Sequence, residues 1–239
     1  MSSIKPFWIG GKHAVLSALN NPSRLIKKVV LLNKENLKLI SSKINSVVEK
    51  EIFFKKIFSN TDLTHQGFAA EIYPLHNLVL KDFLNEKKKE KLTFVILNNI
   101  QDNRNIGSII RTSLAFDVSG LIIEKKNFRS QNVQMYKSAC GAIEKIPIFE
   151  VTNLVTTFKL LKDENIWIYS LDSNSTNNIN DINFSNRTAL VFGSEDKGIN
   201  NLIKQKSDQI IRIPMNALAN SLNVSNAVAS ALTFYKFNK

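Results

Sequence analysis

Apolar and polar residues follow two different spacings in the C-terminal part of the chain. Short apolar runs, typical of buried strands, lie at residues 92–97, 120–125, 145–151, 166–171, 188–192 and 209–213. Between several of them, apolar residues recur every three or four positions, which is typical of helices, at residues 106–116, 153–164 and 199–206. Short apolar strands that alternate with helices predict an α/β domain built on a parallel sheet covered on both faces.

The N-terminal part has the pattern of a smaller α/β unit at residues 4–75. Helical spacing lies at residues 11–19 and 36–50, and strand candidates lie at residues 27–32, 52–57 and 68–73. The stretch that follows is dense in charge, which is typical of a solvated helix end or a linker; an RNA contact is the alternative. The sequence therefore predicts a small domain at residues 1–76, a linker at 77–91 and a larger domain at 92–239.

Charge and cysteine content narrow the class of protein. Lys and Arg outnumber Asp and Glu by 32 to 20, giving a net charge of +12. Such a charge indicates a polyanionic partner, with a general bias of composition toward Lys, Asn and Ile as the alternative. The single cysteine, Cys140, excludes an internal disulfide framework. No apolar run approaches the roughly 20 residues that span a bilayer. With no signal-peptide core at the N-terminus, we expect a cytoplasmic protein that does not contact a membrane.

A polar loop follows the last strand candidate. The strand stops at Pro214, and a helix rich in Ala and Val follows the loop. The loop is crowded with amide and hydroxyl side chains, which are Asn216, Asn220, Ser221, Asn223 and Ser225. An ordinary strand-to-helix connection is short and needs one capping residue. This concentration of polar groups beyond a strand end therefore indicates a binding loop.

Residues 97–111 form a second polar segment after an apolar strand candidate. Gly107 opens a helix whose N–H groups can approach an anion closely. Arg111 lies one turn further along and can face the same side. The alternative is that Asn105 only caps the helix and that Arg111 is a surface charge.

Residues 191–198 form the third polar segment, again after an apolar run. Gly193 follows the strand directly, where a glycine lets a ligand touch the backbone. Glu195 is either a functional carboxylate or a residue that complements the positive end of a helix dipole.

Taken in their order along the chain, the three segments resemble the motifs of the SpoU family of RNA 2′-O-ribose methyltransferases. Asn105, Gly107 and Arg111 match the family pattern N-x-G-x-x-x-R. Residues 193–198 match GSE-x-x-G, and residues 221–225 read SLNVS. The resemblance implies an α/β fold with a trefoil knot, a small α/β substrate-binding domain before it, and S-adenosylmethionine as the methyl donor.

The resemblance also implies a set of site residues. The backbone around Gly193, Ile213 and Leu222 is implied to bind the cofactor. Five residues are implied to be catalytic, namely Asn105, Arg111, Glu195, Ser221 and Asn223. Methyl transfer to a ribose hydroxyl requires positioning and stabilisation of a developing negative charge. It requires no metal, and the three scattered histidines give no reason to expect one.

Arg111 is the residue whose role needs a separate hypothesis. The family often casts this arginine as the general base, but a guanidinium stays protonated because its pKa exceeds about 12. We therefore expect Arg111 to clamp a phosphate and to stabilise the forming alkoxide. The chain also departs from the family pattern, because Ala217 stands where glycine is usual and Asn220 where Glu or Ser is common.

Three further segments carry a weaker resemblance. Residues 138–144 resemble a family segment in which Glu144 is a candidate to line the site, whereas Cys140 is expected to be a packed residue. Residues 11–15 (GKHAV) and 64–72 (THQGFAAEI) resemble the RNA-binding domain of the branch that contains 23S rRNA guanosine 2′-O-methyltransferases.

The resemblance implies 23S rRNA as the partner, with a guanosine in the peptidyl-transferase P-loop as the target, and a homodimer as the assembly. Methylation of a tRNA ribose is one alternative. A noncatalytic RNA-binding module with the same fold is the other, and the presence of Ser221 and Asn223 argues against it.

Overall fold

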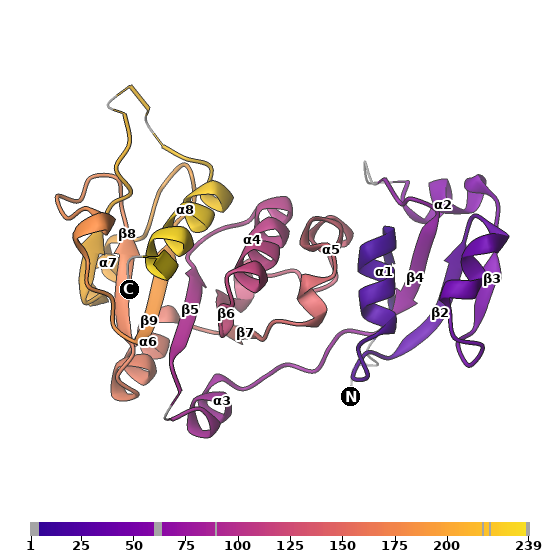
Figure 1. Ribbon diagram of the computed structural model, residues 1–239, viewed down its shortest axis with the longest axis horizontal. Coiled ribbons are helices and arrows are strands. Elements are labelled where there is room, and N and C mark those ends of the chain that lie inside the picture. The colour runs from indigo at the N-terminus through magenta and orange to yellow at the C-terminus, as the bar shows by residue number, and fades with distance from the viewer. Residues whose placement is uncertain (1–4, 60–63, 89, 217, 220, 238–239) are drawn as a thin grey trace. The chain divides into compact units, whose positions relative to one another are not determined.

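The computed structural model describes residues 5–59, 64–88, 90–216, 218–219 and 221–237 (Figure 1). The chain forms two compact units, of which unit 1 comprises residues 1–76 and 129–145, and unit 2 comprises residues 77–128 and 146–239. The sequence predicts a small domain at residues 1–76, a linker at 77–91 and a larger domain at 92–239. By their contacts, residues 129–145 instead belong to the N-terminal unit 1 and not to the C-terminal unit 2.

Unit 1 is built on a four-stranded sheet in the order β1-β4-β2-β3. Its strands are β1 (Phe7–Gly10), β2 (Ile26–Leu31), β3 (Ser46–Val48) and β4 (Phe68–Ile72). Its helices are α1 (Lys12–Leu19), η1 (Lys34–Leu39), α2 (Glu51–Ile57), α5 (Val133–Ala139) and η3 (Ala142–Glu144). The two segments that resemble the RNA-binding domain lie together here, because the Gly11 N–H donates to the Phe68 carbonyl (3.1 Å) and the Lys12 N–H to Gln66 Oε1 (3.2 Å).

Two of the secondary-structure predictions for unit 1 are wrong. Residues 36–50 form no continuous helix; η1 ends at Leu39, and Val47 and Val48 pair with β2 in β3. Residues 52–57 are helix α2 and no strand. Phe54 and Phe58 are four positions apart and both are buried, so a helix puts them on one apolar face. A short apolar run is compatible with either element, and its periodicity cannot decide between them.

A buried ion pair holds residues 129–145 within unit 1. Arg24 binds both carboxylate oxygens of Glu144, at 3.0 Å from Nε and 2.8 Å from Nη2, and both side chains are inaccessible to solvent or nearly so. Asn21 Nδ2 adds a third bond to the carboxylate at 2.8 Å. Arg24 also donates to the Tyr73 carbonyl (2.6 Å) and the Tyr136 hydroxyl (3.1 Å). Burial raises the pKa of Tyr136 to about 12. Glu144 is thus occupied by this network, and the expectation that it lines the site is wrong.

Unit 2 contains the expected parallel sheet. The described residues form six parallel strands in the order β10-β8-β9-β5-β6-β7. These are β5 (Leu92–Leu97), β6 (Gly120–Glu124), β7 (Ile148–Val151), β8 (Trp167–Leu171), β9 (Arg187–Phe192) and β10 (Gln209–Ile211). The helices are α3 (Leu80–Glu86), α4 (Asn103–Ala115), α6 (Leu154–Asp163), α7 (Asn201–Lys206) and α8 (Val224–Phe237), with short 3-10 turns η2 (Lys125–Asn127) and η4 (Ile179–Asp181).

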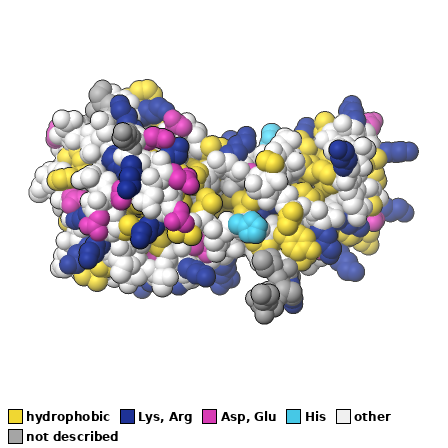
Figure 2. Space-filling view, turned by 90° about the horizontal axis from the view of Figure 1, so that it is seen from below, with side chains coloured by type: hydrophobic (Ala, Val, Ile, Leu, Met, Phe, Trp, Pro, Cys, Tyr) yellow, Lys and Arg dark blue, Asp and Glu magenta, His cyan; other side chains and the backbone are white. Residues whose placement is uncertain are grey.

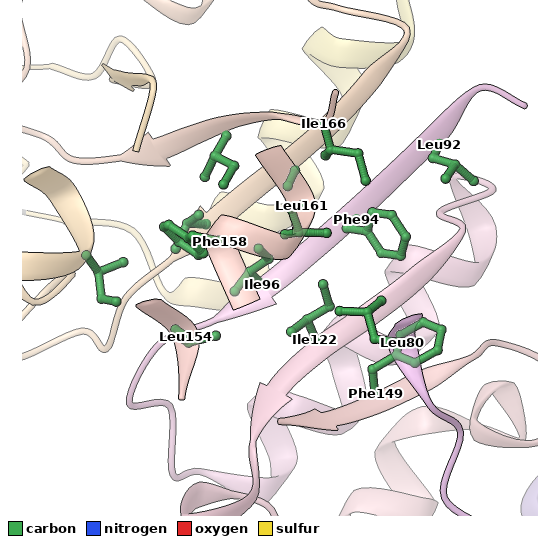
Figure 3. Packing of buried hydrophobic residues seen from close by; sticks show 14 of the residues in the cluster. Leu80, Leu92, Phe94, Ile96, Ile122, Phe149, Leu154, Phe158, Leu161 and Ile166 are labelled. Carbon is green, nitrogen blue, oxygen red and sulfur yellow. The ribbon is translucent and has the colours of Figure 1, made fainter. Parts of the chain in front are cut away.

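Helices cover both faces of this sheet. On one face, residues of α3 and α6 pack on Phe94, Ile96 and Ile122, which point to the same side (Figure 3). On the other face α4 and α8 pack against each other, and Thr93 Oγ1 of β5 donates to the Tyr235 hydroxyl of α8 at 2.8 Å (Figure 1). The strands β5, β6 and β9 are therefore buried from both sides, which explains why they read as continuous apolar runs.

The segment at residues 77–91 is more than a linker. It contains α3, whose Leu80 and Leu84 are buried in the core of unit 2 while Lys81 and Lys88 are exposed. Arg187 holds the end of this segment through hydrogen bonds to the carbonyls of Lys87, Lys88 and Glu90, each at 3.0 Å. The high charge density masked the i, i+4 apolar pair that makes this a packed helix.

Strand order defines where a ligand is expected to bind. From β5 the chain adds β6 and β7 on one side, whereas β9, β8 and β10 lie on the other side of β5. The order therefore reverses between β5 and β9. In open parallel sheets, ligands bind beyond the carboxyl ends of the strands at this switch point. No helix within the described ranges has the length and apolar character needed to cross a membrane.

Candidate functional site: the loops at the switch point

Buried Asn98 joins the two loops that leave β5 and β9. Its backbone N–H donates to the Phe192 carbonyl at 2.9 Å, and its side-chain Oδ1 accepts from the Asn200 N–H at 3.0 Å. Asp102 then starts α4, because its Oδ1 caps the helix by accepting from the Arg104 N–H at 2.7 Å. The polar segments at residues 97–111 and 191–198 thus begin side by side, and the side chain of Asn98 fixes their register.

The loop after β9 is a tight turn that requires glycine at its first position. The Gly198 N–H donates to the Ser194 carbonyl at 2.8 Å, and Gly198 adopts a φ of +62°. This brings the Gly198 backbone against Gly193, where an added Cβ would lie 2.1 Å from the Gly198 carbonyl carbon. Glycine is therefore needed at position 193 because the backbone of Gly198, in the same chain, approaches it closely.

Alanine at Gly193 is expected to destabilise the protein more than alanine at Gly198. At Gly193 the methyl group overlaps backbone that cannot rotate away, and we expect a loss of about 2–3 kcal/mol in the free energy of unfolding. At Gly198 nothing lies within 4 Å of the added Cβ, so only the positive φ opposes it, at about 1 kcal/mol. Urea denaturation of the two variants measures the difference. Equal losses, or a larger loss at Gly198, would contradict this account of the turn.

One carboxylate connects all three polar segments. Glu195 Oε1 accepts from Asn105 Nδ2 at 3.0 Å, from Asn223 Nδ2 at 2.6 Å and from the Val224 backbone N–H at 3.3 Å. Asn223 Nδ2 also donates to Asn105 Oδ1 at 3.1 Å. The three residues lie at the carboxyl ends of β5 and β9 and at the start of α8. We call Asn105, Glu195 and Asn223 the amide–carboxylate cluster.

The orientation of Asn223 is fixed from its other side. Its Oδ1 accepts from the Ser225 N–H at 2.9 Å and from Ser225 Oγ at 2.6 Å, so Asn223 caps α8. The two amide hydrogens then have to point at Asn105 and Glu195. Glu195 is also placed favourably at the positive N-terminal end of α8, where a carboxylate lowers the energy of the helix dipole. The cluster is therefore arranged by several independent contacts, although its side chains face solvent.

Two cavities meet at this cluster. The first has a volume of about 150 Å³ and is lined by the loops after β8, β9 and β10 and by the start of α8. It contains Gly193, Ile213, Ser221 and Leu222, together with Glu195. The second has a volume of about 540 Å³ and is lined by residues 99–102, Asn105 and the loop after β9. Ser194, Glu195 and Val224 line both.

The remaining predicted residues lie as follows. Arg111 is exposed on α4, one turn beyond buried Gly107, and is not among the described residues that line either cavity. Ala217 and Asn220, which depart from the family pattern, lie outside the described residues. Among those that are described, no group of three His, Cys, Asp or Glu side chains is arranged to hold a metal ion.

The loop after β8 contributes residues that sequence analysis missed. Leu171, Asp172 and Ser173 line the first cavity, and Met215 adds to it from the loop after β10. Burial raises the pKa of Asp172, but the hydrogen bond and charge of Lys204 outweigh burial, so the pKa lies below its ordinary value. The sequence predicts a strand at residues 166–171, but the residues directly after this strand match no functional motif. Only the position of that strand next to β9 could have identified this loop.

Together the fold and the site define a class of protein, namely an α/β domain with two cavities at the carboxyl edge of a parallel sheet. The comparisons narrow this class. The profile of the SpoU rRNA methylase family matches residues 92–233. A Staphylococcus saprophyticus protein named for the TrmH family of tRNA/rRNA methyltransferases is 35% identical, over 95% of this chain and 93% of its own length. The chain belongs to the SpoU family of RNA methylases.

Further relatives agree with that assignment over nearly the whole chain. YacO of Bacillus subtilis, also named for the TrmH family, is 31% identical over 96% of this chain and 94% of its own. Among solved structures, the SpoU methyltransferase AviRb from Streptomyces viridochromogenes, in complex with the cofactor AdoMet, superposes with a TM-score of 0.80. That likeness covers 96% of this chain and 89% of AviRb at 19% identity, and it concerns the fold.

Proposed function

We propose that this protein transfers a methyl group from S-adenosylmethionine to a ribose 2′-hydroxyl of structured RNA. The observation that carries the proposal is the amide–carboxylate cluster, which ties the three polar segments together between two adjoining cavities. Membership of the SpoU family supports RNA methylation as the reaction. S-adenosylmethionine, which is bound in the related AviRb structure, is the proposed donor.

The first cavity is the proposed donor site. Gly193, Ile213 and Leu222 line it, and their backbone N–H and C=O groups are the proposed partners of the adenine and ribose. Its volume of about 150 Å³ lies below the roughly 300–1,000 Å³ of small-molecule sites, so the donor has to extend beyond it. The sulfonium end of the donor would reach the acceptor at the wall that the first cavity shares with the second.

The reaction requires positioning and charge stabilisation. In the proposed reaction the 2′-oxygen would form its bond to the methyl carbon as the bond from that carbon to sulfur breaks. The electron pair of the broken bond would stay on the sulfur of the leaving S-adenosylhomocysteine, and the hydroxyl proton would pass to solvent water. The amide hydrogen of Asn105 that Glu195 does not accept, together with Ser221 on the loop before α8, is the proposed donor that orients the ribose and stabilises charge on its oxygen. Asn223, whose two amide hydrogens point at Asn105 and Glu195, is the proposed residue that positions Asn105. Glu195 is the proposed anchor that holds the two amides in place.

Arg111→Lys tests the proposed phosphate clamp. Lysine keeps the positive charge but loses the planar fork that binds phosphate through two parallel hydrogen bonds. We expect the affinity for RNA and the value of kcat/KM both to fall about 10-fold or more, because lysine acts only as a point charge. Steady-state methylation and RNA titration measure the two effects, with Arg104→Lys, at an exposed position near the start of the same helix, as the control. Wild-type values in Arg111→Lys would exclude the bidentate role.

The proposed substrate is 23S rRNA, at a guanosine of the peptidyl-transferase P-loop. Two segments that resemble the rRNA branch, at residues 11–15 and 64–72, support this choice and pack together in unit 1. The competing substrate is a tRNA ribose. Mapping of 2′-O-methyl groups in both RNAs from a strain that lacks the gene decides between them. Loss of a mark from 23S rRNA is expected; loss of a tRNA mark with intact 23S rRNA would overturn the choice.

We propose that the protein acts in the cytoplasm. Two structural proposals also accompany this function. We infer that the polar loop before α8 forms a trefoil knot, as the family resemblance implies, and that the protein is a homodimer. The packing of α8 onto α4 supports the return of the chain from edge strand β10 to the middle of the sheet. Light scattering at micromolar concentration should give about twice the chain mass of 27.0 kDa. A monomer mass would contradict the dimer.

A further inference from the structure

The second cavity differs in charge from the protein as a whole. The chain carries a net charge of +12, and on the face that Figure 2 shows, basic side chains are widely spread with acidic ones among them. Among the described residues that line the cavity, however, the ionisable ones are Asp102, Glu195, Asp196 and a single lysine, Lys197. An acidic wall repels phosphate. The RNA group that enters this cavity is therefore expected to be uncharged, whereas the backbone phosphates bind elsewhere.

Its size and position fit one nucleobase. A volume of about 540 Å³ lies within the roughly 300–1,000 Å³ of small-molecule sites. The cavity shares Ser194, Glu195 and Val224 with the proposed donor site. A nucleoside whose ribose lies at the amide–carboxylate cluster can therefore place its base only a short distance away. Enzymes that act on one nucleotide of an RNA commonly separate its base from the stack and bind the edge of that base.

The lining determines which base fits. An ionised carboxylate only accepts hydrogen bonds, and a lysine only donates. One oxygen of Asp102 is used by the helix cap, which leaves the other, and Asp196 is exposed on the turn after β9. Guanine presents two adjacent donors, N1–H and the N2 amino group, beside the O6 acceptor. Adenine, cytosine and uracil each place an acceptor next to their donor on the same edge, so a carboxylate meets only one favourable partner.

We propose that the second cavity reads the target base as guanine, with Asp196 and Asp102 as the residues that determine specificity. The carboxylate of Asp196 accepts from N1–H and the N2 amino group, Asp102 offers the second acceptor, and Lys197 donates to O6. This assignment rests on the proposed function, since it concerns the base attached to the methylated ribose. It is independent of which of the two RNA classes is the substrate.

The experiment compares fragments of whichever RNA the protein methylates, 23S rRNA or tRNA, in which the target guanosine is kept or replaced by inosine or adenosine. Inosine lacks only the N2 amino group. The wild-type protein should methylate guanosine with a kcat/KM about 10-fold above inosine, and adenosine more poorly still. In Asp196→Asn the amide donor opposes the N2 amino group, so kcat/KM for guanosine should fall about 10-fold and that for inosine much less. Asp102→Asn should lower discrimination to a smaller degree, and its amide keeps the cap of α4.

Asp163→Asn, on the exposed end of α6, is the matched control and should leave discrimination unchanged. A loss of folding would lower the rates on guanosine and inosine together and leave their ratio intact, so the ratio is the decisive readout. Equal methylation of guanosine and inosine by the wild-type protein would overturn the proposal, and so would full discrimination in both Asp variants. Absence of methylation on every RNA, in protein that binds S-adenosylhomocysteine, would instead contradict the proposed function.

Discussion

Glu195→Ala is expected to lower kcat about 100- to 1,000-fold with little effect on the free energy of unfolding. The carboxylate accepts three hydrogen bonds, from Asn105, Asn223 and the Val224 N–H. Alanine leaves both amides without the acceptor that fixes their orientation. Because the cluster faces solvent, water can satisfy the released N–H groups, so stability changes little while geometry is lost. Single-turnover methylation with saturating RNA and donor measures the effect on the chemical step.

A graded series separates the hydrogen bond of Glu195 from its charge. Glu195→Gln keeps an oxygen at the same position, and a neutral hydrogen bond has roughly half the strength of a charge-assisted one. We therefore expect Glu195→Gln to fall between the wild type and Glu195→Ala. Glu86→Ala, on the exposed side of α3, is the control and should retain full activity. If Glu195→Ala turned over as fast as the control, the cluster would have no part in the reaction.

Arg24→Met should lower the free energy of unfolding by about 3–5 kcal/mol, the largest loss of stability expected in unit 1. Arg24 and Glu144 are both buried, so removal of one partner leaves a charge without compensation. Replacing both, as Arg24→Met with Glu144→Leu, should recover much of the loss, since an apolar pair of similar volume is tolerated there. Urea denaturation followed by circular dichroism measures the three variants.

The exposed pair between Lys27 and Glu71 provides the comparison. Its Nζ–Oε1 distance of 3.0 Å is close to that of the buried pair, but half of the lysine side chain is accessible to solvent. Lys27→Met should therefore change stability by about 0–1 kcal/mol. A loss in Arg24→Met no larger than in Lys27→Met would mean that the ion pair does not hold residues 129–145 to unit 1.

The parallel sheet and the polar loops could be predicted because their signals lie within short stretches of sequence. Continuous apolar runs mark strands buried on both faces, and glycine at residue 193 marks a close backbone approach. The contacts that assemble the cluster could not be predicted in the same way. Asn223 lies 118 positions from Asn105 and 28 from Glu195, and no periodicity relates side chains across such separations.

The expectations that failed have physical causes that only tertiary structure reveals. Residues 52–57 form a helix because Phe54 and Phe58 pack into one core, which outweighs the strand character of a short apolar run. Residues 129–145 belong to unit 1 because Glu144 pairs with an arginine 120 positions earlier. The loop after β8 joins the first cavity only because β8 inserts next to β9, which is a property of the topology.

Whether the three polar segments create one binding site for a methyl donor is tested most directly by calorimetric titration with S-adenosylhomocysteine. Folded protein, supplied with its RNA, should release or absorb heat that saturates at one ligand per chain and should lose that heat when S-adenosylmethionine is already bound. Folded protein that shows neither heat nor competition would contradict the account.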